Sequence, residues 1–173
     1  NGYEVKKIVT ACPHCFNTFK HEYPQFGGEY EVYHYTEFIF ELIKEGKIKL
    51  KSGNGAVTYH DSCYLGRYND IYKQPREIIS TINPAGLKEI PEKNRGNSLC
   101  CGAGGGRMWM EESIGTRINH LRTDQILTSG AKTVISACPY CLTMFSDGIK
   151  EKEVDDKLEA VDLAEYVEQA MIS

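Results

Sequence analysis

Five of the seven cysteines have a spacing typical of a metal–sulfur site. They follow the pattern C-x36-C-C-G-x35-C-P-x-C and are Cys63, Cys100, Cys101, Cys138 and Cys141. Residues 64–99 and 102–137 are two equal gaps of 36 residues on either side of the adjacent pair. Adjacent cysteines form a disulfide only through a strained ring, because their Cα atoms are ~3.8 Å apart. They can instead bind two different irons, so the pattern favours a multi-iron centre.

Two other kinds of thiol site fit part of this pattern. Five thiols exceed the four ligands of a zinc site or a simple cubane cluster. A zinc site that uses four of them is still an alternative, although zinc sites usually combine two C-x2-C pairs. The segments C-P-H-C at Cys12–Cys15 and C-P-Y-C at Cys138–Cys141 also match the thiol–disulfide redox motif. A metal-free dithiol oxidoreductase is therefore the second alternative.

Glycines follow the adjacent cysteines directly, at residues 102 and 104–106. The segment is not a dinucleotide fingerprint, because Arg107 stands where the third glycine would be, and it lacks the end of a P-loop. Without Cβ atoms, Gly102 and Gly104 let backbone N–H groups approach sulfur closely. We therefore include both glycines in the predicted cofactor-binding set, with a flexible turn as the alternative.

His60 is the histidine closest in sequence to this cysteine pattern. It lies three residues before Cys63, at the end of an expected strand. A histidine there can donate a hydrogen bond to a cluster sulfur or carry a proton. An ordinary hydrogen-bonded role fits equally well, so no catalytic residue is assigned.

Composition restricts the classes of function. The 173 residues are 41% hydrophobic and 25% charged, with a formal net charge of −4. This acidic balance argues against nucleic-acid partners and anionic membrane surfaces. No stretch approaches the ~18 apolar residues of a membrane span, so none is expected in this chain. An odd number of cysteines in a chain of this length indicates a reducing compartment, and we expect the cytoplasm.

Strands and helices alternate along the chain. Strands are expected at residues 5–9, 56–60, 87–90 and 134–137, and helices at 37–45, 76–82, 111–127 and 163–171. The alternation predicts an α/β fold with a largely parallel sheet. In such sheets ligands gather at the carboxyl ends of strands, and this edge would collect the cysteine-bearing loops.

The chain contains an internal repeat. Residues 8–19 and 134–145 both read as a strand, a C-P-x-C motif and a helix. Thr36 lies 24 residues after Cys12, and Asp162 lies 24 residues after Cys138; each is a candidate helix N-cap. The repeat predicts a duplicated module, with the C-terminal part of a first copy in residues 1–51 and a complete second copy in 56–173. Because a strand begins almost at Asn1, we also expect the chain to be part of a longer polypeptide.

Three motifs together resemble the CCG (cysteine-rich) domain of iron–sulfur oxidoreductases. They are YHDxCYLGR at residues 59–67, CCGxGGGxxW at 100–109 and ACPxC at 137–141. The family that these motifs resemble includes heterodisulfide reductase catalytic subunits and the iron–sulfur subunits of glycolate oxidase and anaerobic glycerol-3-phosphate dehydrogenase. It also includes membrane-associated partners of electron-transferring flavoproteins. The likeness covers about residues 5–173 and implies duplicated, Rossmann-like modules.

The resemblance implies a ligand set. In heterodisulfide reductase members such a module binds a noncubane [4Fe-4S] cluster through five cysteines, which here correspond to the five of the spacing pattern. Cys12 and Cys15 match the last two ligands of a first module. Ser62 stands where many relatives have proline, and Tyr64 where many have histidine. Some members of the family bind zinc or another cluster type.

The resemblance also implies a function and partners. The chain would be part of an oxidoreductase subunit that carries electrons or reduces a disulfide. Its partner would be a ferredoxin-type or flavoprotein subunit, with a small-molecule disulfide or a quinone as substrate. No C-x2-C-x2-C-x3-C-P run is present, so electrons must arrive from another domain or subunit. Contact with the cytoplasmic face of a membrane would come through such a domain or subunit.

Overall fold

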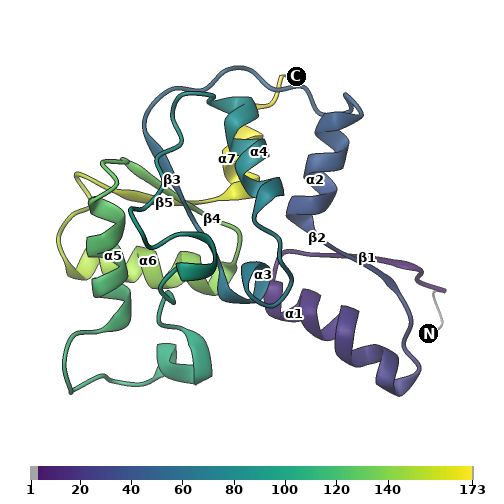
Figure 1. Ribbon diagram of the computed structural model, residues 1–173, viewed down its shortest axis with the longest axis horizontal. Helices are drawn as coiled ribbons and strands as arrows, with labels where there is room; N and C mark the ends of the chain where they lie inside the picture. Colours follow the sequence, from purple (N-terminus) through teal and green to yellow (C-terminus); the bar gives the residue numbers. More distant parts are fainter. Residues whose placement is uncertain (1–3, 173) are drawn as a thin grey trace.

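The computed structural model of the protein describes residues 4–172, which form two parallel sheets (Figure 1). The strands are β1 (Lys7–Thr10), β2 (Glu31–His34), β3 (Val57–His60), β4 (Thr133–Ser136) and β5 (Glu159–Asp162). Strands β1 and β2 make one sheet, and the other has the order β3-β4-β5. Every pairing between these strands is parallel, which confirms the predicted α/β fold with parallel sheets.

Helices connect the strands. They are α1 (Pro13–Asn17), α2 (Tyr35–Lys44), α3 (Cys63–Gly66), α4 (Lys73–Ile82), α5 (Ile118–Leu127), α6 (Pro139–Glu151) and α7 (Leu163–Ala170). Short π and 3-10 segments extend α1 over residues 18–26, and two further 3-10 segments occupy Arg95–Asn97 and Gly104–Trp109. Among residues 4–172, no helix is long and apolar enough to cross a bilayer.

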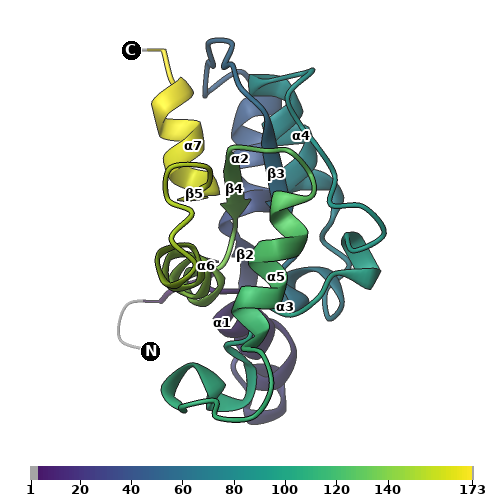
Figure 2. The same ribbon diagram turned by 90° about the vertical axis from the view of Figure 1, so that its left-hand side faces the viewer.

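Strand β4 is the centre of the larger sheet and is buried on both faces. Successive side chains of a strand point to opposite faces, so Val134 and Ile135 enter different cores. Val134 packs with residues of α5 and α6, and Ile135 with residues of α4 and α7. Figure 2 shows α5, α6 and α7 around this strand. The apolar run of β4 is thus the pattern expected of a parallel strand covered by helices.

The internal repeat is visible in the fold. The run β1-α1-β2-α2 matches β4-α6-β5-α7, and in both a cysteine N-caps the first helix with proline directly after it. Asp162 N-caps α7 as predicted, through a capping box with Glu165. The predicted N-cap Thr36 is wrong. His34 caps α2, and the Thr36 hydroxyl contacts His34 Nδ1 at 2.9 Å.

The two repeats share one hydrophobic core. Phe16 and Tyr35 of the first repeat belong to the same cluster as Ile79 and Leu163. The Tyr35 hydroxyl also donates a 3.0 Å hydrogen bond to Asp162 Oδ1. The module boundaries at residues 1–51 and 56–173 therefore stay a prediction.

Three predicted elements differ from the structure. The helix expected over residues 111–127 begins only at Ile118, because Gly115 adopts a left-handed φ of 73° and Ile114 faces solvent. The strand expected at 87–90 is a single parallel bridge between Leu87 and Val57. Helix α4 begins two residues before Pro75, within the first turn where proline is tolerated.

Replacing two isoleucines of the predicted 111–127 helix tests its corrected boundary. Ile126→Ala should lower the free energy of unfolding by about 2–5 kcal/mol, because this side chain is 0% exposed in the core. The matched change Ile114→Ala should stay within about 0.5 kcal/mol, because Ile114 is 92% exposed. Chemical denaturation measures both values. Equal losses would contradict an irregular segment at 111–117.

Candidate metal–sulfur site

Parallel pairing brings the first and last cysteine segments together. His60 ends β3 and Ser136 ends β4, and the two residues are partners in the register of the sheet. Both strands therefore finish at the same edge. Cys63 begins α3 just beyond β3, while Cys138 N-caps α6 just beyond β4. Cys141 lies in the first turn of α6.

The loop that carries Cys100 and Cys101 has little regular structure, so polar side chains hold it. Arg67 donates through Nε to the carbonyl of Gly96 at 3.1 Å and through a second nitrogen to the carbonyl of Ser98. Both carbonyls lie just before the adjacent cysteines. Because Arg67 follows α3, this contact ties the loop to the segment of Cys63.

A buried ion-pair network holds the same loop to β3. Asp61 accepts two hydrogen bonds from Arg76, at 2.7 and 2.8 Å. Arg76 also donates to both carboxylate oxygens of Glu89, at 2.6 and 2.9 Å. The backbone N–H of Arg95 donates to Asp61 at 2.6 Å. Bidentate arginine–carboxylate pairs fix geometry strongly, so the start of the loop is held in place.

All five cysteines of the spacing pattern meet at this edge of the sheet. Neighbouring thiols influence one another's pKa in the order Cys63, Cys100, Cys101, Cys141 and Cys138, so the five sulfurs lie close together along this sequence. All are free thiols; three are buried, and Cys63 and Cys100 are half-buried. Three loops that lie far apart in the sequence thus bring five cysteine sulfurs together, and we call this set of five protein thiols the sulfur cluster.

The hydrogen bonds divide these thiols into donors and acceptors. Hydrogen bonds from Cys101 and Cys63 hold the pKa of Cys100 far below its usual range, with help from the N–H groups of Gly102 and Gly104. The Gly102 nitrogen is 3.4 Å from Cys100 Sγ. Donation to Cys100 raises the pKa of both Cys63 and Cys101.

A second thiolate lies at the other end of the chain. The hydrogen bond from Cys141 lowers the pKa of Cys138 to about 5, against the opposing effect of burial, and His14 lowers it further. The neighbouring sulfurs of Cys101 and Cys138, together with burial, raise the pKa of Cys141, so this thiol stays protonated. The cluster therefore carries negative charge at neutral pH and offers soft donors to a metal.

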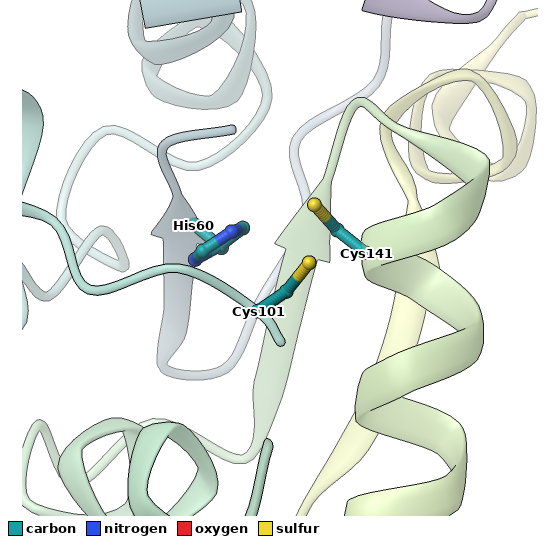
Figure 3. Close-up of side chains that lie close together, drawn as sticks. All are labelled: His60, Cys101 and Cys141. Atoms are coloured by element: carbon teal, nitrogen blue, oxygen red, sulfur yellow. The ribbon is translucent and has the colours of Figure 1, made fainter. Parts of the chain in front are cut away.

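His60 lies beside the middle of the thiol chain. One of its ring nitrogens and the sulfurs of Cys101 and Cys141 are all within 4.8 Å of one another. Figure 3 shows the three side chains converging from β3, the loop and α6. Burial lowers the pKa of His60 well below its usual value, and nearby Arg122 lowers it further, so the ring is neutral. No motif in the sequence pointed to Arg122.

The two predicted glycines allow the backbone to approach the sulfurs. Gly102 has a φ of 100°, and a Cβ there would lie 3.2 Å from the backbone nitrogen of Asn119. A Cβ at Gly104 would lie 3.9 Å from Cys100 Sγ. A glycine with positive φ follows directly, since Gly105 has a φ of 65°. Close approach of the backbone, rather than flexibility, explains why glycine is needed at 102.

Cys12 and Cys15 lie outside the five-sulfur chain but are linked to it through His14. The ring nitrogen Nδ1 of His14 is 3.8 Å from Cys12 Sγ. Hydrogen bonds with Cys12 and with Cys138 raise the pKa of His14 to about 9. The sequence analysis missed this histidine, although it occupies the variable position of the first C-P-x-C motif.

An open pocket of about 310 Å³ lies next to the site. His14 and Tyr140 line it, together with Gly104 and Trp109. His14 also packs on Tyr64, with ring centroids 4.1 Å apart. The variable residues of both C-P-x-C motifs therefore face one shared hollow, which is large enough for a small ligand.

Comparison with known proteins finds relatives named as oxidoreductases. The protein is 51% identical over 170 residues to a probable iron-sulfur-binding oxidoreductase, FadF, of Bacillus subtilis, covering 98% of this chain and 24% of the relative. It is 47% identical over 180 residues to the EtfAB:quinone oxidoreductase of Syntrophomonas wolfei, covering 99% and 25%. It is 35% identical over 170 residues to one subunit of the dihydromethanophenazine:CoB–CoM heterodisulfide reductase of Methanosarcina mazei, covering 96% and 41%.

The chain thus spans about a quarter of the length of the first two relatives. The family described as the cysteine-rich domain, CCG, matches residues 57–146, which is more than half of the chain and includes all five cysteines of the sulfur cluster. The protein therefore belongs to the CCG cysteine-rich domain family.

Proposed function

We propose that this chain is the electron-carrying part of an iron–sulfur oxidoreductase subunit. Its centre would be a [4Fe-4S] cluster of the noncubane type. The ligands would be Cys63, Cys100, Cys101, Cys138 and Cys141. The observation that carries the proposal is the convergence of five free cysteines from three loops at one edge of the sheet. The relatives named as iron–sulfur, quinone and heterodisulfide oxidoreductases support the same class.

The donor set fits iron and sulfide better than one zinc ion. All five candidate ligands are sulfur, and Cys100 and Cys101 are adjacent, which suits two different irons. A zinc site built from His60, Cys101 and Cys141 is the alternative, since these three groups lie together. However, His60 Nδ1 already accepts a 3.3 Å hydrogen bond from Arg122. The metal-free dithiol alternative leaves the convergence of Cys63 and Cys100 without a role.

The surrounding residues would serve such a centre in two ways. When bound, an iron–sulfur cluster accepts and donates electrons one at a time. Burial of Cys101, Cys138 and Cys141 excludes water from the site. The N–H groups of Gly102 and Gly104 donate to sulfur and stabilise its negative charge. Hydrogen bonds to sulfur and exposure to solvent are both determinants of cluster potential.

The remaining assignments complete the proposal. Cys12 and Cys15 are half of a second metal site in a first module, and residues 56–173 are the complete second module. Electrons come from or go to a ferredoxin-type or flavoprotein partner. The pocket between His14 and Trp109 admits a small-molecule disulfide or a quinone. The protein works in the cytoplasm, or at the cytoplasmic face of a membrane through another domain or subunit.

Metal and sulfide analysis tests the ligand set. Protein purified without oxygen should be brown and contain iron with acid-labile sulfide. Cys100→Ser should lose most of both, because this thiolate has two thiol neighbours in the chain. Cys15→Ser is the matched control and should keep the iron of the five-cysteine site. One stoichiometric zinc with no iron or sulfide in anaerobic wild-type protein would overturn the proposal.

A redox titration separates the cluster from a dithiol. A one-electron centre changes its reduced-to-oxidised ratio tenfold per 59 mV, whereas a two-electron dithiol needs only about 30 mV. We expect the one-electron slope, followed by electron paramagnetic resonance in the anaerobic protein. A two-electron slope that persists in Cys100→Ser but disappears in Cys138→Ser would instead establish the dithiol oxidoreductase.

A further inference from the structure

Arg122 is the largest fully buried side chain among residues 4–172, and it is 0% exposed. Its charge meets only neutral partners. Nε donates to His60 Nδ1 at 3.3 Å, and the other nitrogens donate to the Lys93 carbonyl, Gln125 Oε1 and Ser98 Oγ at 2.8, 2.9 and 3.0 Å. Within the described residues no carboxylate forms an ion pair with it. A buried cation without a negative partner is strongly unfavourable.

Arg76 shows what a satisfied buried arginine looks like in the same protein. Its guanidinium contacts two carboxylates, those of Asp61 and Glu89. Asp61 is also the acid that most favours the charged form of Arg122, but both of its oxygens are already bonded to Arg76. Asp61 therefore attracts Arg122 only at a distance, and further negative charge near Arg122 would stabilise the buried guanidinium.

The sulfur cluster lies beside His60, the residue that accepts the hydrogen bond from Arg122 Nε. Burial lowers the pKa of Arg122 to about 10, and Asp61 opposes this shift most strongly. At neutral pH the guanidinium thus keeps its charge. His60 has a ring nitrogen within 4.8 Å of the sulfurs of Cys101 and Cys141.

The hydrogen bond from Arg122 also determines the state of His60. Arginine has only hydrogens to donate, so Nδ1 of His60 must be the acceptor. The single ring hydrogen is then on Nε2, and the imidazole is neutral. Arg122 thereby fixes both the tautomer and the orientation of the ring nearest to the sulfurs.

The geometry points to Arg122 as the fixed positive charge of the metal–sulfur site, which raises its reduction potential and orients His60. This inference rests on the proposed cluster. With a cluster bound, reduction by an external one-electron donor would add one negative charge to the site, with no bond to a protein residue formed or broken. A buried cation stabilises that added charge strongly, because Coulomb interactions are strong in a low dielectric. Arg122 is a positioning and charge-setting residue and contacts no substrate.

The test compares the midpoint potentials of three anaerobic variants with that of wild-type protein. Arg122→Gln should favour the oxidised state about tenfold, which is a midpoint about 59 mV more negative for one electron. Arg122→Lys keeps the charge and should retain most of the wild-type potential. The control Arg117→Gln removes an arginine that is 30% exposed and paired with Glu151 at 2.7 Å, and should leave the potential unchanged.

The outcomes distinguish a role for the positive charge of Arg122 from a structural role in which Arg122 only supports the loop. An iron-loaded Arg122→Gln protein with a wild-type potential would overturn the inference, as would an equal shift in Arg122→Lys. If Arg122→Gln does not bind iron, iron retained by Arg122→Lys supports the role of charge. Loss of iron from both variants would show that the shape of the guanidinium, and not its charge, supports the site, and this result would overturn the inference. Wild-type protein without iron and sulfide overturns the proposed function itself.

Discussion

The parallel register between β3 and β4 is the constraint on which the site depends. Because His60 and Ser136 are partners, the backbone leaves the sheet at the same edge after both strands. Cys63 and Cys138 are then both placed at this edge of the sheet, without any contact between them being required. A shift of this register by one residue would turn every strand side chain to the other face and expose part of the core. The apolar side chains that bury β4 therefore also position the sulfurs.

The third cysteine segment has no such support and depends on charge. Arginine side chains hold its loop. These contacts fix the position of the loop but add little net stability, because burying ions is costly. Arg76 offsets this cost with two carboxylates. Arg122 does not, which leaves a charge whose natural counterpart is the sulfur cluster. Polar groups buried next to the site thus serve its geometry and its electrostatics together.

Local sequence signals predicted most of the framework. The strands before Cys63 and Cys138, the C-P-x-C helix starts and the Asp162 cap follow from short-range patterns. The convergence of the cysteines followed from their types and spacing. Arg122 could not be found, because a charged residue in an amphipathic helix normally faces solvent. The predicted start of the 111–127 helix was wrong for a related reason. The helical spacing of apolar residues includes Ile114, but this side chain is exposed and packs against no core.

His14 has a consequence for how much of the protein makes one working unit. The family match starts at residue 57, so a fragment cut to that boundary would keep every sulfur of the five. It would lose the imidazole that contacts Cys138 from the opposite repeat, together with the Tyr64 packing that holds this ring. A fragment cut at the family boundary would thus keep the sulfurs but lack part of the surroundings of Cys138, which the first repeat supplies.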